Sequence, residues 1–246
     1  MQFEQSPQRR YFPVLYHALV FAVWMFTLYK DITFIQPAKR NFGVHQTYGG
    51  PWKFLTFWNE LINTFYFGIA LLNDLCGSNA GPEDGKDKHS TLQKFRDRMY
   101  SILAFPIGAF VVASFWSLYA VDRELVYPAE LDKIIPSWLN HVMHTTVLPF
   151  LLIEAYVVYH EYPSKKVGIP GIVFFSSLYQ FWILWIAFKA DIWVYPILRV
   201  LSWPMRIVFM VLCWVLVMIL YLCGHEVTQM CWGPTQGKTL QAKKVK

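Results

Sequence analysis

Long apolar segments alternate with short polar ones along most of the chain. Segments at about 11–29, 52–76, 99–121, 138–159, 169–188 and 204–224 are each long enough to cross the roughly 30 Å hydrocarbon core of a bilayer as a helix. The pattern predicts an all-α fold, a polytopic membrane helix bundle with six transmembrane helices. We expect a single membrane domain over residues 1–246, with a cytoplasmic basic tail over residues 225–246.

Two of these segments depart from a uniformly apolar pattern. Polar residues lie within the second segment: Asn59, Glu60, Asn63, Asn73 and Asp74. Pro106 interrupts the third, which a membrane helix tolerates where neighbouring helices bond the freed carbonyl. The second segment is therefore too polar to face lipid all round.

Composition agrees with a membrane protein. Hydrophobic residues make up 55% of the 246 residues and charged residues only 15%, whereas soluble domains have about 25% charged residues. The net charge of +6 is spread over loops and tail, and aromatic residues do not alternate with Lys and Arg, so nucleic-acid binding is not expected. The four cysteines form no CxxC pair, which argues against a disulfide framework or a zinc site.

An even number of spans leaves both termini on one side of the membrane. The tails and loops on that side hold more of the 22 Lys and Arg residues than the other side, which favours cytoplasmic termini. The chain ends in "KKVK", which resembles a dilysine retrieval signal and predicts the endoplasmic reticulum. The first apolar segment lacks a small-residue cleavage site, so we expect a retained span rather than a removed signal peptide.

Reactive side chains gather near the starts of the second and fourth spans. Both spans enter the membrane from the non-cytoplasmic side, so their first turns share one depth. At 1.5 Å per residue, Thr56 lies about 6 Å below Trp52, and His144 lies about 9 Å below Trp138. Two polar stripes at similar depth predict one shared polar cavity.

Each stripe occupies one helical face. Thr56, Asn59, Glu60 and Asn63 follow i, i+3, i+4, i+7, and Asn140 and His144 are one turn apart. The simpler interpretations are structural. A threonine in a membrane helix usually bonds the carbonyl at i−4, and a single buried histidine is often only a hydrogen-bond partner. His141 and His144 are spaced to bind a metal, but no third ligand completes that site, so neither a metal nor a cofactor is predicted.

Four stretches resemble a known family. They are "HQTYGGPWKFLTF" (45–57), "LAFPIGAFVVASFW" (103–116), "DRELVYPAELDKIIPSWLNHVMHTTVLPF" (122–150) and "WVYP" (193–196). They are similar to the androgen-induced gene / androgen-dependent TFPI-regulating protein family over about residues 45–226. The resemblance implies a multipass membrane hydrolase of fatty acid esters of hydroxy fatty acids. It implies that Thr56 is the nucleophile and His144 its partner.

This implied mechanism is acyl transfer to the Thr56 hydroxyl, which needs a base to take its proton. Substrate or oxyanion contacts are expected from Asn140, His141, Asn59 and Glu60, and Asn140 is also placed to fix the tautomer of His144. The predicted partner is a lipid ester, and the sequence does not predict an oligomeric state. The alternative is a non-enzymatic lipid carrier or small transporter, but polarity concentrated toward one side of the membrane favours a one-sided site over a transit path.

Overall fold

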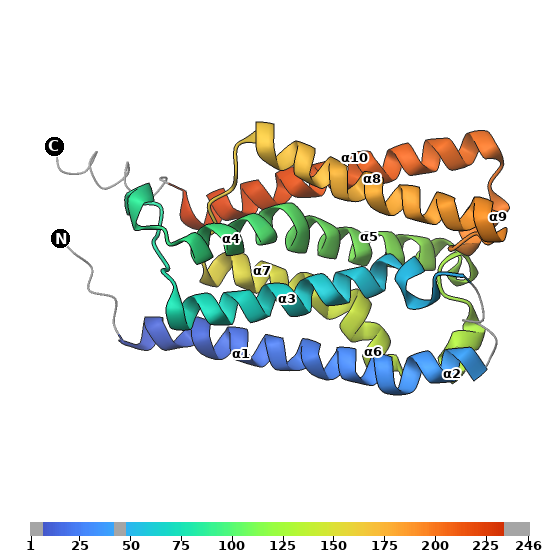
Figure 1. Cartoon of the computed structure of the whole chain (residues 1–246), viewed down its shortest axis with the longest axis horizontal. Coiled ribbons are helices and arrows are strands. Elements are labelled where there is room, and N and C mark those ends of the chain that lie inside the picture. The colour runs from blue at the N-terminus through green and yellow to red at the C-terminus, as the bar shows by residue number, and fades with distance from the viewer. Residues whose placement is uncertain (1–6, 42–47, 234–246) are drawn as a thin grey trace.

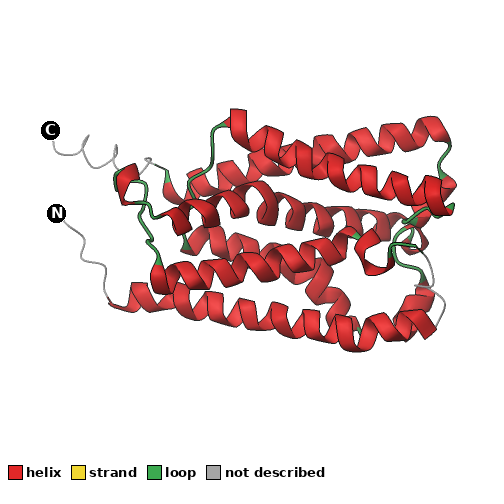
Figure 2. Ribbon diagram, in the orientation of Figure 1, coloured by secondary structure: helices red, strands yellow, loops and turns green. Residues whose placement is uncertain are grey.

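The computed structural model describes residues 7–41 and 48–233. The regular structure of these described residues is all helical: loops join the helices, and no strand is present among them (Figure 2). The helices, including short 3₁₀ turns, are α1 (Pro7–Lys30), α2 (Gln36–Asn41), η2 (Gly50–Lys53), α3 (Leu55–Cys76), η3 (Lys86–Lys88), α4 (Thr91–Met99), α5 (Phe105–Val121), η5 (Arg123–Leu125), η6 (Ala129–Lys133), α6 (Ser137–His141), α7 (Val147–Val157), α8 (Lys165–Ala190), α9 (Pro196–Val200) and α10 (Trp203–Trp232).

The long helices run side by side along the long axis of the molecule (Figure 1). α1, α3, α4 with α5, α6 with α7, α8 and α10 pass in alternating directions. The start of α1 and the end of α10 lie at one end of the bundle, here called the terminal end (Figure 1). α2, α6, α9 and the start of α3 lie at the other, here called the α6 end (Figure 1). The first turns of α3 and α6 therefore meet at the same end.

Four helical stretches of the described chain are long and apolar enough to cross a membrane. They are Tyr11–Lys39, Thr91–Val121, Lys165–Ala190 and Trp203–Trp232. α3 and the α6–α7 helix, which correspond to the spans predicted at 52–76 and 138–159, do not reach that standard. Both hold polar side chains that the bundle buries, such as Asn59 and Glu60 on α3 and Glu154 on α7. Their polarity faces the interior rather than lipid.

Three helices contain a π-helical turn, and each turn stands just before a proline. The turns are η1 (Asp31–Ile35), η4 (Tyr100–Ala104) and η7 (Val142–Thr146), and they precede Pro37, Pro106 and Pro149. A proline lacks the N–H that an α-helix would use, and a local π turn absorbs the resulting mismatch without ending the helix. The interruption predicted at Pro106 is thus accommodated within a continuous helix.

Two boundaries differ from the apolar pattern. The first helix does not end near residue 29 but continues through η1 and α2 to Asn41. Asp31 is buried there and accepts a hydrogen bond from Gln36 Nε2 at 2.6 Å, which links the two polar side chains within the helix. α10 runs to Trp232, beyond the predicted tail boundary at 225, and Thr228 is buried on it. The "KKVK" sequence lies outside the described residues.

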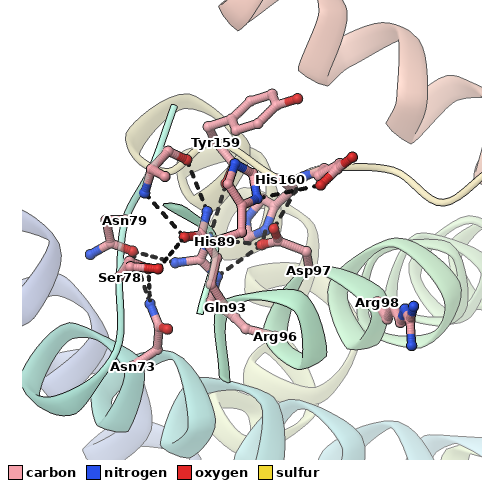
Figure 3. Close-up of polar contacts among 12 residues, drawn as sticks. Asn73, Ser78, Asn79, His89, Gln93, Arg96, Asp97, Arg98, Tyr159 and His160 are labelled. Carbon is pink, nitrogen blue, oxygen red and sulfur yellow. Dashed lines mark hydrogen bonds and ion pairs between the residues drawn. The ribbon is translucent and has the colours of Figure 1, made fainter. Parts of the chain in front are cut away.

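A buried polar network joins four helices at the terminal end. Glu154 on α7 lies 2.7 Å from His17 Nε2 of α1 and accepts a 2.5 Å hydrogen bond from the Tyr66 hydroxyl of α3. His160 Nε2 lies 3.2 Å from Glu154 Oε1, the same oxygen that accepts from Tyr66, whereas His17 faces Oε2. His160 also reaches Asp97 on α4, which pairs with Arg96 at 2.7 Å (Figure 3). Each buried charge thus has a partner of opposite or variable charge.

Replacing Glu154 by Ala tests this network. The change leaves His17, Tyr66 and His160 without their shared carboxylate in a site that is 0% exposed. We expect a loss of about 3–5 kcal/mol of stability, the usual cost of breaking a buried pair. The loss is measured as a lower thermal midpoint of the purified protein in detergent. Glu226→Ala, whose side chain is 66% exposed, is the control. Equal midpoints for Glu154→Ala and wild type would show that the network contributes nothing.

Candidate active site

Two tyrosines fix the start of α3. The Leu55 N–H donates to the Tyr195 hydroxyl at 3.1 Å, and the Tyr179 hydroxyl donates to the Lys53 carbonyl at 2.8 Å. The two hydroxyls are 2.8 Å apart. The first N–H groups of a helix have no intrahelical acceptor, so Tyr195 supplies one that the backbone lacks. Burial raises the pKa of the Tyr195 phenol, which keeps its hydroxyl proton in place.

The carbonyl of Trp52 is occupied by two indole groups. Trp58 Nε1 donates to it at 2.6 Å and Trp182 Nε1 at 2.9 Å. Trp52 is four residues before Thr56, but Phe54 between them is extended, so this carbonyl is not in the position where a threonine inside a helix finds its usual i−4 acceptor. Other hydroxyls in the described helices do use that acceptor, including Thr27, Thr64 and Thr146. The Thr56 hydroxyl points elsewhere.

Thr56 Oγ1 lies 3.1 Å from His144 Nε2. The contact joins α3 to the π turn η7, two segments 88 residues apart in the chain. Thr56 is partly exposed and His144 is 6% exposed, so the pair sits at the edge of the protein interior. A hydroxyl and an imidazole at this distance form the nucleophile–base arrangement of acyl-transfer enzymes.

The π turn sets the position of His144. In π spacing its carbonyl would accept from the residue five positions later, which is Pro149 and has no N–H. Trp116 Nε1 donates to this carbonyl instead, at 2.8 Å. Phe115, the preceding residue of α5, stacks on the imidazole with ring centres 3.8 Å apart and planes at 16°. Two adjacent side chains of α5 thus hold the backbone and the ring of His144.

Asn140 fixes the tautomer of the imidazole. His144 Nδ1 lies 2.9 Å from Asn140 Oδ1 and 3.1 Å from the Asn140 carbonyl oxygen. Both are acceptors, so Nδ1 carries the proton and Nε2 presents a lone pair. That lone pair faces the Thr56 hydroxyl. The neutral ring is therefore arranged to accept the proton of Thr56.

Two cavities meet at Thr56. The first, here the apolar cavity, has a volume of about 120 Å³ and lies among α3, α5, α8 and α10, with walls that include Ile107, Phe110, Phe209 and Val217. Tyr195 and Phe115 also line it, together with Thr56. Ligand sites for drug-sized molecules are about 300 Å³ or more. The apolar cavity therefore has room for only a short apolar group.

The second, here the polar cavity, has a volume of about 100 Å³ and lies beside His144 on the other side of Thr56. Asp31, Gln36, Lys39 and Glu60 line it, all of them buried. Four of their oxygen atoms have no hydrogen-bond partner in the described part of the chain: both oxygens of Glu60, Oδ1 of Asp31 and Oε1 of Gln36. Buried polar atoms are normally satisfied, so these four oxygens are available to accept hydrogen bonds from water or another polar molecule in the cavity.

The remaining predicted site residues lie in different places. Glu60 lines the polar cavity, one helical turn from Thr56. Asn59 does not line either cavity; its side-chain oxygen accepts from Asn63 within α3. His141 is exposed, lies 3.0 Å from the Thr145 hydroxyl and stacks on Trp116. The structure thus brings Thr56, His144, Asn140 and Glu60 together and leaves Asn59 and His141 apart.

Several residues at the site were not predicted from the sequence. Tyr195 belongs to the "WVYP" stretch that resembles the family. That resemblance is the sequence feature that could have marked Tyr195 as a residue of the site. Lys39 and Asp31 follow the apolar part of the first segment, where the pattern alone suggests a loop. In the described part of the chain, no group of three or more His, Cys, Asp or Glu side chains is placed to hold a metal ion.

Comparisons with known proteins cover most of the chain. The family model described as FAR-17a/AIG1-like protein matches residues 12–229, which include both helices of the Thr56–His144 pair. The chain belongs to this family. No solved structure matches the chain.

Relatives in the FAR-17a/AIG1-like family come from mammals and from yeast. The chain is 44% identical to the human androgen-induced gene 1 protein over 82% of its own length and 85% of that protein. It is 38% identical to the human androgen-dependent TFPI-regulating protein over 75% of the chain and 79% of that protein. A membrane protein of Schizosaccharomyces pombe is 24% identical over 65% of the chain and 66% of its own length.

Tyr195→Phe tests the anchoring of α3. The substitution keeps the ring but removes the acceptor of the Leu55 N–H, and a buried unpaired donor costs about 1–3 kcal/mol. We expect a lower thermal midpoint in detergent. Tyr29→Phe is the matched control, because Tyr29 is exposed and has no such role. If Tyr195→Phe melts no earlier than Tyr29→Phe, water or another group satisfies the Leu55 N–H.

Proposed function

We propose that this protein is an integral-membrane hydrolase of lipid esters that uses Thr56 as nucleophile and His144 as base. The observation that supports it most is the 3.1 Å contact between Thr56 Oγ1 and His144 Nε2. Because Thr56 stands in the first turn of α3, no preceding helical turn takes up its hydroxyl, and Asn140 leaves Nε2 unprotonated to receive its proton. A structural threonine would need neither arrangement.

The first half of the reaction forms an acyl-threonine. Thr56 Oγ1 attacks the ester carbonyl carbon while His144 Nε2 takes the hydroxyl proton. The resulting imidazolium then gives that proton to the alcohol oxygen as the carbon–oxygen bond breaks. The alcohol leaves, and the acyl group stays on Thr56. Phe115 and Trp116 hold the imidazole in place through both transfers.

The oxyanion needs a donor close to Thr56. Thr56 is the second residue of α3, so its own backbone N–H belongs to the first turn, whose N–H groups lack intrahelical acceptors. The positive end of the helix dipole acts at the same place. The Thr56 N–H is therefore our candidate for the oxyanion donor. Asn140, which was also considered for that task, uses its side-chain oxygen to orient His144.

The two cavities suit an ester with a long apolar chain. The acyl chain enters the apolar cavity, and the alcohol oxygen faces the polar cavity. The resemblance of the motifs to the androgen-induced gene family makes fatty acid esters of hydroxy fatty acids the substrate class that we propose. Because Thr56 and His144 lie near the α6 end, a bound ester would be close to the membrane surface, where water is available.

We also propose the membrane arrangement. α3 and the α6–α7 helix run parallel to the four apolar helices (Figure 1), and with them the chain crosses the membrane six times. Both chain ends then face the cytoplasm, and the "KKVK" end addresses the protein to the endoplasmic reticulum. The Thr56–His144 pair lies on the opposite, lumenal side.

Activity of variants tests the pair. Thr56→Ala and His144→Ala are each expected to lower the rate of hydrolysis of a fatty acid ester of a hydroxy fatty acid by at least about 10²-fold, because each removes one member of the proton-transfer pair. Thr56→Ser keeps a hydroxyl and is the matched control. Rates are measured on purified protein of wild-type thermal midpoint. Unchanged turnover in either Ala variant would remove that residue from the mechanism.

Covalent labelling tests the nucleophile directly. A fluorophosphonate probe is expected to attach to Thr56 Oγ1 in wild type and not to react with Thr56→Ala. The probe requires the base, so His144→Ala should label far more slowly. Peptide mapping by mass spectrometry locates the adduct. An adduct on another residue would contradict the assignment of Thr56.

A further inference from the structure

The polar cavity is lined by buried oxygen atoms that have no hydrogen-bond partner in the described chain and take no part in the proposed acylation step. Glu60 is 1% exposed, and neither of its carboxyl oxygens has a hydrogen-bond partner in the described chain. Asp31, by contrast, uses one oxygen to accept from Gln36. A buried carboxyl group with both oxygens unpaired is costly unless a molecule in the cavity donates to it.

Glu60 also stands at the right place along α3. It follows Thr56 by four residues, so the two side chains share a face with Cβ atoms about 5–6 Å apart. One water molecule, with hydrogen bonds of about 2.8 Å, fits between a carboxyl oxygen and the carbonyl of an acyl group on Thr56. His144 lines the same cavity, so a water held there has both an acceptor and a base nearby.

We propose that the polar cavity is the chamber for hydrolytic water and that Glu60 holds the water that cleaves the acyl-threonine. This inference rests on the proposed function. One O–H of the water donates to Glu60, and its oxygen is thereby aimed at the acyl carbon. Since the acyl chain occupies the apolar cavity, water has its own route to the other face of the ester.

The step balances without any further reagent. The water oxygen bonds to the acyl carbon while its second proton passes to His144 Nε2. The tetrahedral intermediate collapses, the bond from carbon to Thr56 Oγ1 breaks, and that oxygen takes the proton from His144. A fatty acid leaves, and the Thr56 hydroxyl is restored. Glu60 acts only on the water, so its removal should slow this half of the reaction and spare the first.

The test separates the two halves with a p-nitrophenyl fatty acid ester and purified full-length protein. Release of p-nitrophenol in the first turnover measures acylation, and intact-protein mass after dilution into substrate-free buffer measures the lifetime of the acyl group. For Glu60→Gln we expect acylation within about 2-fold of wild type and deacylation slowed by about 10²-fold. Acyl-Thr56 should then accumulate. Glu226→Gln, on the exposed surface of α10, should match wild type in both steps.

A second variant covers the case in which Glu60→Gln does not fold. Glu60→Asp keeps the carboxyl group but draws it back toward the backbone by one methylene. This variant, too, should slow deacylation and leave the acylation rate close to that of wild type. Equal slowing of both steps, or wild-type deacylation in a folded variant, would overturn the inference and leave the proposed function intact. If neither wild type nor Glu60→Gln forms an adduct on Thr56 while p-nitrophenol is released, the proposed function itself is wrong and the inference falls with it.

Discussion

The Thr56 hydroxyl can meet a histidine because Thr56 stands in the first turn of α3, where the extended Phe54 before it leaves no helical i−4 carbonyl to bond. Two indoles, one from α3 and one from α8, saturate the Trp52 oxygen. The start of α3 is held as well, since Tyr195 accepts its first N–H. Opposite, Pro149 deprives the His144 carbonyl of its backbone donor, and Trp116 supplies one. On both sides of the pair, side chains therefore complete backbone hydrogen bonds at His144 or close to Thr56.

Polar groups are divided between the two ends of the bundle and treated differently at each. At the terminal end, Glu154 and Asp97 belong to one closed network. His17 pairs with Glu154, and Arg96 and His160 pair with Asp97. At the α6 end, Glu60 and part of Asp31 face a cavity with oxygens left unpaired. The first arrangement stabilises the packing of α1, α3, α4 and α7, and the second leaves capacity for a ligand. Within the described residues, the buried carboxyl oxygens that lack a partner therefore lie at the α6 end.

Much of the fold follows from the sequence because apolar length is what a membrane helix requires. Parity of the spans and the family resemblance both select Thr56 and His144, which the structure places 3.1 Å apart. The continuation of the first helix past Lys30 was missed, since it depends on a tertiary environment that buries Asp31. The sequence also did not predict that Lys39 lines the polar cavity or that Tyr195 accepts from the Leu55 N–H, because both contacts arise from tertiary folding. Both residues come from segments with no periodic pattern, and only folding brings them to Thr56.

The π turn at residues 142–146 has a consequence for how the family can vary. Such a turn holds one residue more than an α-helical turn, and each residue of an α-helix advances by about 100°. Deleting a single residue from it would leave the length of the α6–α7 helix almost unchanged. It would nevertheless rotate the imidazole out of register with α3. Insertions and deletions in this short stretch are thus constrained by the angle at which they turn the imidazole rather than by helix length.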